Sequence, residues 1–257
     1  MRYALDVQYI GKNYSGSQIQ LENGKIIEKP TIQNELEKAL CTLIKHSKIC
    51  ENIRPIKTIF SGRTDKGVNS LGQVVHFDTD EDIVASSFVY HLNEILPSDI
   101  SVSNLRKVSD LFHAQKSATS RYYRYELINR RYKQAFDGDI LRVKYDLNIE
   151  RMQNALNYLL GEHNFSSFKS SGTLNPSTDC IITEAKVKKQ GDRVIIDIKG
   201  NRFLYNMVRT IIGTLLEIEG HNLSAEHMKY VLEAKDRRKA GQTVSPYGLT
   251  LMKVEYL

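Results

Sequence analysis

Apolar residues recur along this 257-residue chain with two different periods, and the two periods alternate from one end to the other. Stripes at helical spacing occupy residues 32–44, 84–95, 152–160, 203–218 and 224–235. Segments expected to form strands occupy residues 3–9, 57–60, 73–78, 121–128, 181–189, 193–199 and 249–256. Helix, hairpin and helix recur in both halves, which favours an α+β fold built from two similar parts. We expect one part in residues 1–105 and the other in residues 106–257.

Cap and turn residues support these predicted elements. Thr31 and Ser224 each stand at the start of a helical stripe as an N-cap. The tripeptide 190–192 (Gln-Gly-Asp) joins two alternating segments, which predicts a hairpin whose core-facing residues are Val194, Ile196 and Ile198. Residues 161–179 are rich in Ser and Thr, and we expect them to form a surface loop.

Charge is distributed unevenly along the chain. The formal net charge is +6, and it divides into −2 for residues 1–105 and +8 for residues 106–257. A basic half is typical of a protein that binds a polyanion such as a nucleic acid, although it also fits a solubilising surface. No apolar run approaches the roughly 18 residues of a membrane span, and the N-terminus shows no apolar signal segment. The three cysteines form no C-x-x-C pair, so we expect a cytoplasmic protein with free thiols.

Most standard catalytic motifs are absent from the sequence. There is no H-E-x-x-H, no Cys/His set at zinc spacing and no G-x-S-x-G, and the seven histidines are scattered. The acidic group Asp78, Asp80, Glu81 and Asp82 precedes a helical stripe, which favours a role at the helix N-terminus over a cation site. We therefore expect neither a metal ion nor a nucleotide cofactor.

A glycine-rich loop at residues 61–72 separates two predicted strands. Within it Arg63 and Asp65 stand between Gly62 and Gly67, where the backbone can approach a ligand closely. The loop lacks the Lys-Ser/Thr pair of a phosphate-binding P-loop. Two interpretations stay open at this point: a ligand site, or a solvated turn in which Asp65 caps its own backbone.

Two further segments combine arginine with apolar or aromatic neighbours. On a strand, Arg121, Tyr123 and Tyr125 share one face, where they could stack bases and pair phosphates or could pack as ordinary β residues. Arg209 lies in an almost wholly apolar helical stripe. Either it leaves the helix on the polar side, or it has a partner, because unpaired burial of a charge is costly.

Taken in order, short motifs along nearly the whole chain resemble the TruA family of tRNA pseudouridine synthases. The motifs are Tyr9-x-Gly11-x-x-Tyr14-x-Gly16-x-Gln18, Thr31-Ile32-Gln33, Ser61-Gly62-Arg63-Thr64-Asp65-x-Gly67-Val68, Gly72-Gln73-Val74-Val75-His76-Phe77, Phe112-His113-Ala114, Arg121-x-Tyr123-x-Tyr125, Gly161-x-His163-x-Phe165, Phe203-x-x-x-Met207-Val208-Arg209 and Pro246-x-Gly248-Leu249. The sequence departs from the family pattern at Ser17, where an aromatic residue is common, at Lys66, where alanine is usual, and at Asn69, where histidine is usual.

The resemblance implies both a fold and a reaction. The fold is the pseudouridine synthase fold, with two similar α/β subdomains around a central, mostly antiparallel sheet and the active cleft between them. The reaction is the isomerisation of uridine to pseudouridine in the tRNA anticodon stem-loop, mostly at positions 38 to 40. The family acts as a homodimer without a cofactor.

The same resemblance implies roles for individual residues. Asp65 corresponds to the catalytic nucleophile, Arg209 to its ion-pair partner and Arg63 to the residue that helps flip the base. Tyr123 corresponds to the residue that stacks on the uracil and can transfer a proton. The substrate-binding residues would be Tyr123, Arg121, Gly62, Gly67 and Leu249.

Two other functions remain as alternatives. A non-catalytic RNA-binding or RNA-folding module on the same fold explains the basic half but not the combination of Asp65 with Arg209. A metal-dependent nuclease would use the acidic residues 78–82 and would require a divalent ion.

Overall fold

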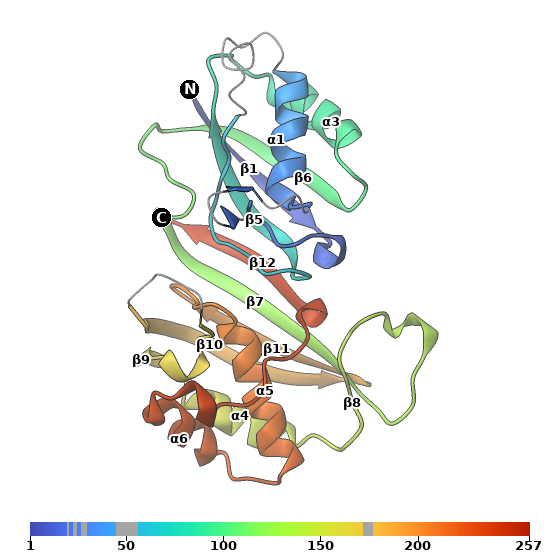
Figure 1. Ribbon diagram of the computed structural model, residues 1–257, viewed down its shortest axis with the longest axis vertical. Coiled ribbons are helices and arrows are strands. Elements are labelled where there is room, and N and C mark those ends of the chain that lie inside the picture. The colour runs from blue at the N-terminus through green and yellow to red at the C-terminus, as the bar shows by residue number, and fades with distance from the viewer. Residues whose placement is uncertain (20, 23–24, 27–29, 45–55, 172–176) are drawn as a thin grey trace. The chain divides into compact units, whose positions relative to one another are not determined.

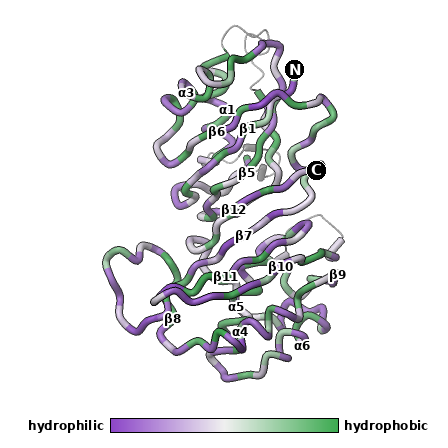
Figure 2. Tube along the Cα trace, turned by 180° about the vertical axis from the view of Figure 1, so that it is seen from behind, coloured by the Kyte–Doolittle hydropathy of each residue, from purple (hydrophilic) through white to green (hydrophobic). Residues whose placement is uncertain are grey.

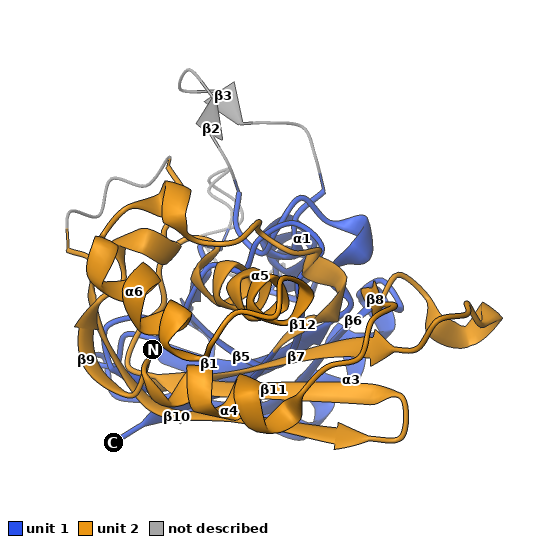
Figure 3. Ribbon diagram, turned by 90° about the horizontal axis from the view of Figure 1, so that it is seen from below, with its two compact units in different colours: residues 1–119, 251–257 blue, residues 120–250 orange. Residues whose placement is uncertain are grey.

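A computed structural model describes residues 1–19, 21–22, 25–26, 30–44, 56–171 and 177–257 (Figure 1). These residues form two compact units (Figure 3). The first unit contains residues 1–119 and 251–257, and the second contains residues 120–250. The boundary predicted between residues 105 and 106 falls inside a strand of the first unit, because residues 100–108 pair with the N-terminal strand.

The sheet of the first unit has the strand order β6-β1-β5-β12, and β4 pairs with β5. The strands are β1 (Arg2–Tyr9), β4 (Ile59–Phe60), β5 (Asn69–Asp78), β6 (Ile100–Val108) and β12 (Leu249–Tyr256). The pairs β1–β5, β1–β6 and β4–β5 are all antiparallel. Two short strands, β2 (Leu21–Glu22) and β3 (Lys25–Ile26), form a separate antiparallel pair. The prediction for residues 249–256 is confirmed, whereas β5 begins four residues earlier than predicted.

The first unit contains the helices α1 (Ile32–Leu43) and α3 (Ala85–Ile95), which contact each other beside the sheet (Figure 1). Thr31 caps α1 as predicted, since its hydroxyl accepts a hydrogen bond from the Asn34 N–H at 3.2 Å. Leu36 and Leu40 of α1 are fully buried in one apolar core with strand residues such as Leu5. Burial of that apolar face, more than helix propensity, holds α1 in place.

The acidic residues before α3 do not cap that helix. No side chain caps its N-terminus, and its first turn contains no acidic residue. Asp78 instead binds Arg2, while Asp82 accepts hydrogen bonds from Tyr3 and Lys107. For Asp78 and Asp82 the predicted helix-terminal role is therefore wrong, because side chains of the neighbouring strands β1 and β6 bind these two carboxylates.

The sheet of the second unit has the order β7-β11-β10-β9, and β8 pairs in parallel with β7. The strands are β7 (Ala118–Asn129), β8 (Arg142–Val143), β9 (Gly161–Asn164), β10 (Asp179–Gln190) and β11 (Arg193–Gly200). The predicted hairpin is confirmed, with Gln190 opposite Arg193 and Gly191 at φ 59° in the turn. Its predicted core residues, Val194, Ile196 and Ile198, are all buried. The strands of this unit contain both hydrophobic and hydrophilic residues (Figure 2).

The helices of the second unit are α4 (Ile149–Asn157), α5 (Met207–Gly220) and α6 (Glu226–Ala234). Helix α4 packs on β10, and α5 contacts both α4 and α6. The helix predicted from Phe203 begins four residues later, because Asn206 adopts a left-handed conformation with φ 61°. Helix α6 begins after Ala225, one residue beyond the predicted cap.

The described residues also contain five short 3-10 helices: η1 (Gly11–Asn13), η2 (Ala135–Asp137), η3 (Ser166–Phe168), η4 (Arg237–Lys239) and η5 (Pro246–Gly248). The loop predicted at residues 161–179 is partly wrong, because β9 and η3 lie within it and Phe165 and Phe168 are fully buried. Among the described residues Cys41 and Cys180 form no disulfide, and Cys50 lies outside these residues. Within the described ranges no helix has the length and apolar character needed to cross a membrane.

Candidate active site

The loop that carries Asp65 connects β4 to β5 in the first unit. Its first residue continues the strand pairing, since the Ser61 N–H donates to the Val74 carbonyl at 2.8 Å. A turn then follows, in which the Val68 N–H donates to the Asp65 carbonyl at 3.1 Å. Gly67 has φ 81°, a conformation that side-chain-bearing residues adopt at a cost. The Asp65 side chain is partly exposed at the start of this turn.

Buried polar side chains lie beneath the loop and bind its backbone. The Gln73 side chain, 0% exposed, donates to the Gly62 carbonyl at 2.9 Å and accepts a hydrogen bond from the Ser61 hydroxyl. The Tyr9 and Thr64 hydroxyls are hydrogen-bonded at 2.8 Å. Burial raises the pKa of Tyr9, so its hydroxyl keeps its proton at neutral pH. A satisfied buried network of this kind fixes one conformation of the loop above it.

Sequence reasoning did not assign a role to Tyr9, Thr64 or Gln73. One local signal existed at Gln73, which is a polar residue directly before the two apolar residues Val74 and Val75 in the buried part of β5. Such a residue requires hydrogen-bond partners when it is buried. The partners themselves come from segments 11 and 64 residues away in sequence, which no local pattern identifies.

The exposed residues of the loop flank Asp65 on both sides. Arg63 and Lys66 are both exposed to solvent. A Cβ atom added to Gly62 would meet no atom within 4 Å, so the space beside this residue is open. The loop therefore presents a carboxylate, a guanidinium and open backbone to solvent from a rigid base.

The predicted aromatic strand segment lies on β7 in the second unit. The rings of Tyr123 and Phe203 meet edge to face, with centroids 5.1 Å apart. Arg121 donates to the Asn201 carbonyl at 2.7 Å. Tyr125, on the same face, is fully buried and donates its hydroxyl to the Ser245 carbonyl at 3.0 Å. Tyr125 is thus a core residue, whereas Tyr123 keeps part of its ring accessible.

The opposite face of β7 carries a separate cluster. Arg124 forms two hydrogen bonds with Asp197, at 2.8 and 3.0 Å, and a third with the Tyr122 hydroxyl at 2.8 Å. The hydrogen bonds that Arg124 donates to the Asp197 carboxylate raise the pKa of Arg124. The predicted division of residues 121–125 between two faces is confirmed.

Arg209 lies in the first turn of α5 and is held by two directed hydrogen bonds. Its Nη1 donates to the Asn206 side chain at 2.7 Å, and its Nε donates to the Val244 carbonyl at 2.8 Å. The side chain is only partly exposed. Of the two alternatives for this arginine, the hydrogen bonds favour a partnered side chain, and both partners are neutral groups of the second unit.

The predicted site residues divide between the two units. Asp65, Arg63, Gly62 and Gly67 belong to the first unit, whereas Tyr123, Arg121, Arg209 and Leu249 belong to the second. Leu249 is 5% exposed and begins β12. The ion pair between Asp65 and Arg209 stays a prediction. Over the ranges that the structure describes, no cluster of three or more His, Cys, Asp or Glu side chains could hold a metal ion.

Comparison with known proteins identifies the family of this chain. A family model described as tRNA pseudouridine synthase matches residues 6–115 and 155–257. This chain belongs to the tRNA pseudouridine synthase family. The tRNA pseudouridine synthase A of Colwellia psychrerythraea is 40% identical over 257 residues, which cover 100% of this chain and 94% of the relative. The protein of the same name from Photobacterium profundum is also 40% identical, with 100% and 93% covered.

A third relative gives the same result. The tRNA pseudouridine synthase A of Thermoanaerobacter pseudethanolicus is 38% identical over 251 residues, which cover 97% of each chain. The matched segments of the tRNA pseudouridine synthase family contain Asp65 and Arg209, whereas Arg121 and Tyr123 lie between them. The pseudouridine synthase fold expected from the sequence is confirmed by this membership and by the antiparallel sheets with helices in both units.

Proposed function

We propose that this chain isomerises uridine to pseudouridine in the anticodon stem-loop of tRNA, at positions 38 to 40. The observation that carries the proposal is the loop of residues 61–68 in a chain of this family. There a carboxylate stands next to an exposed arginine on a backbone that buried hydrogen bonds hold rigid. The protein acts in the cytoplasm as a homodimer.

The reaction explains why a carboxylate is needed. The N-glycosidic bond of uridine breaks, the uracil turns, and a carbon–carbon bond forms between the same sugar and base. No electrons are gained or lost and no water is consumed, so the chemistry requires no redox cofactor. Asp65 is the nucleophile, acting at the sugar or base.

The other residues bind, orient and expose the substrate. Arg63 helps to displace the target nucleotide from its stack, a step that costs a few kcal/mol. Tyr123, supported edge to face by Phe203, stacks on the flipped uracil. Arg209 pairs with Asp65 and favours its charged form, and Arg121, Gly62, Gly67 and Leu249 contact the substrate.

The experiment follows the hydrogen that leaves carbon 5 of the uracil when pseudouridine forms. Asp65→Ala is incubated with tRNA labelled with tritium at that carbon, and release of tritium is measured beside tRNA binding. We expect no release above background and binding close to that of the unaltered protein. Asp80→Ala, which removes an exposed carboxylate of the same unit, should release tritium normally.

Turnover by Asp65→Ala would overturn the assignment of the nucleophile. If the unaltered protein binds tRNA and releases no tritium, the chain is instead an RNA-binding module on the same fold.

A further inference from the structure

Ser17 joins helix α1 to the residue immediately before Asp65. The Ser17 hydroxyl accepts a hydrogen bond from the Thr64 N–H at 2.8 Å, and the Ser17 N–H donates to the Thr64 carbonyl at 3.1 Å. On its other side, the Ser17 carbonyl accepts from the Gln33 N–H in the first turn of α1 at 2.9 Å. Ser17 is 0% exposed, so water does not replace these bonds.

Asn69 makes a corresponding bond at the other end of the turn. It is the first residue of β5, directly after Val68, whose N–H closes the turn on the Asp65 carbonyl. The Asn69 side-chain oxygen accepts a hydrogen bond from the Gly11 N–H at 2.9 Å. Residues 11–17 are thus bonded to both ends of the turn that carries Asp65.

Two glycines allow this segment to lie directly against the loop backbone. A Cβ atom at Gly11 would lie 2.0 Å from the Val68 carbonyl oxygen, and one at Gly16 would lie 3.0 Å from that of Thr64. Gly16 also has φ 122°, which disfavours other residues there. Because backbone is packed against backbone, the loop has little room to move toward residues 11–17. The side-chain hydrogen bonds of Ser17 and Asn69 therefore act across a fixed distance.

Ser17 and Asn69 also stand at two of the positions where the sequence is expected to depart from the family pattern. A serine hydroxyl can accept a hydrogen bond from the Thr64 N–H, which an aromatic hydrocarbon ring at the same position cannot do. We propose that Ser17 and Asn69 are positioning residues, which together hold the backbone on both sides of Asp65 and so orient its carboxylate for reaction. This inference rests on the proposed role of Asp65.

The expected effect is on turnover rather than on substrate binding. Ser17→Ala and Asn69→Ala each remove one side-chain acceptor, so the Thr64 N–H or the Gly11 N–H loses its hydrogen bond, while the backbone bond between Ser17 and Thr64 remains. Because small displacements of a reacting group lower rates steeply, we expect kcat to fall about tenfold to a hundredfold with KM for tRNA nearly unchanged. Asn69→Asp keeps the acceptor oxygen and should restore most of the kcat lost in Asn69→Ala.

A matched control separates positioning from general loss of stability. Ser167 is another fully buried serine, whose hydroxyl accepts the Asp236 N–H at 2.9 Å in the second unit. Ser167→Ala should lower Tm as much as Ser17→Ala does but leave kcat unchanged. If Ser17→Ala does not fold, the comparison of Asn69→Ala with Asn69→Asp carries the test.

Three outcomes decide between the proposals when Asp65→Ala is measured alongside. If Asp65→Ala is inactive and the two positioning variants lose kcat as expected, both proposals stand. If Asp65→Ala is inactive while Ser17→Ala and Asn69→Ala turn over at the unaltered rate, only the positioning proposal is overturned. If Asp65→Ala is active, both are overturned.

Discussion

The hydroxyl groups of Tyr9 and Thr64, the residue directly before Asp65, share a buried hydrogen bond of 2.8 Å. Tyr9 comes from the end of β1 and Thr64 from the loop that carries Asp65. The side-chain nitrogen of Gln73 lies 3.4 Å from the same tyrosine hydroxyl as a second donor. One phenol oxygen therefore connects the N-terminal strand, the loop and β5.

Removing that oxygen tests how much the connection contributes to the free energy of unfolding. Tyr9→Phe keeps the ring but leaves the Thr64 hydroxyl and the Gln73 amide short of one partner each. We expect the free energy of unfolding to fall by about 1–3 kcal/mol, the usual cost of a buried polar group left unsatisfied. Urea unfolding measures the change. Tyr90→Phe removes an exposed hydroxyl and should change stability by less than about 0.5 kcal/mol; equal losses in the two variants would contradict the prediction.

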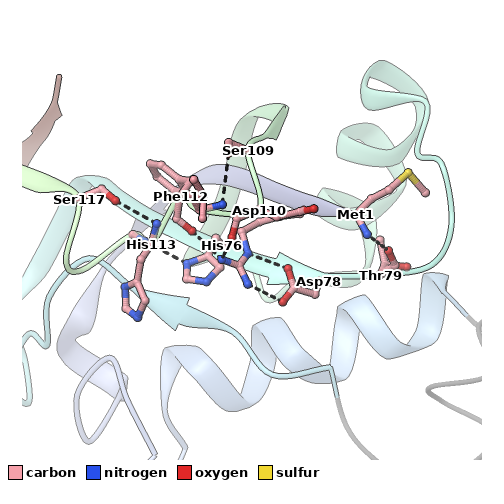
Figure 4. A network of polar contacts seen from close by, with 12 residues as sticks. Met1, His76, Asp78, Thr79, Ser109, Asp110, Phe112, His113 and Ser117 are labelled. Carbon is pink, nitrogen blue, oxygen red and sulfur yellow. Dashed lines mark hydrogen bonds and ion pairs between the residues drawn. The ribbon is translucent and has the colours of Figure 1, made fainter.

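His76 makes the stability of the first unit depend on pH. It is 2% exposed on β5, close to His113 and Asp78 (Figure 4). Its Nδ1 accepts a hydrogen bond from the Ala114 N–H at 3.1 Å. Burial lowers the pKa of His76 to about 4, with further lowering by Arg2 and His113 against an opposing effect of Asp78. The folded protein thus resists a proton that the unfolded chain accepts near pH 6.5.

The direction of the effect follows from this difference. Above pH 6.5 His76 is neutral in both states and contributes no pH dependence. Between pH 6.5 and 4 the unfolded state binds the proton first, so stability falls by about 3 kcal/mol in total, and below pH 4 this contribution levels off. Arg2 lowers the pKa of Asp78 in the folded protein. As the pH falls, stability that depends on the Asp78 charge is therefore lost only from near the ordinary pKa of 3.8 downward.

Urea unfolding at a series of pH values separates the two groups. His76→Asn keeps an acceptor for the Ala114 N–H but cannot be protonated in this range. Its stability should be nearly constant between pH 6.5 and 4, where that of the unaltered protein falls. A parallel fall in both proteins would assign the pH dependence to another group.

Glu219 and Arg151 form an ion pair in the second unit whose carboxylate is fully buried. The Glu219 side chain is 0% exposed, and it accepts hydrogen bonds from Arg151 at 2.6 and 3.0 Å and from the Asn148 N–H at 2.7 Å. Arg151→Ala leaves a buried carboxylate with its charge uncompensated. We expect a loss of about 3–5 kcal/mol in the free energy of unfolding.

An exposed pair provides the comparison for this prediction. Lys229 and Glu233 lie one turn apart on α6, with side chains 55% and 65% exposed. Lys229→Ala should change stability by no more than about 0.5 kcal/mol. A loss below 1 kcal/mol in Arg151→Ala, measured by urea unfolding at pH 7, would show that Glu219 finds other donors or water.

The fold could be predicted from the sequence wherever local pattern decides the conformation. Apolar spacing and a Thr cap define α1, and the Gln-Gly-Asp turn defines the β10–β11 hairpin, because these signals lie within a few residues of the elements they specify. The start of α5 was missed for the opposite reason. Phe203 and Leu204 continue the apolar stripe, yet the left-handed backbone at Asn206 interrupts the helix, and apolar spacing does not record backbone dihedrals.

The candidate site shows the same difference between local signals and contacts formed on folding. Asp65, Tyr123 and Arg209 were predicted from motifs, each of which is continuous in sequence. The groups that hold the loop were not, since the bond from Thr64 to Ser17 joins residues 47 positions apart and that from Gly11 to Asn69 joins residues 58 apart. Such partners depend on how α1 and β5 pack, and packing is a property of the folded chain.

The two hydrogen bonds of Arg209 predict that its shape matters as well as its charge. Lysine retains the positive charge, but its single ammonium cannot replace donors at Nε and Nη1 that bind Val244 and Asn206 in a fixed plane. In Arg209→Lys we expect kcat for tRNA to fall about a hundredfold, because the remaining cation is no longer held in one orientation. Arg193→Lys alters an exposed arginine paired with Glu126 and should keep the unaltered kcat. Single-turnover rates at saturating tRNA distinguish the two variants, and an unchanged rate in Arg209→Lys would show that charge alone suffices.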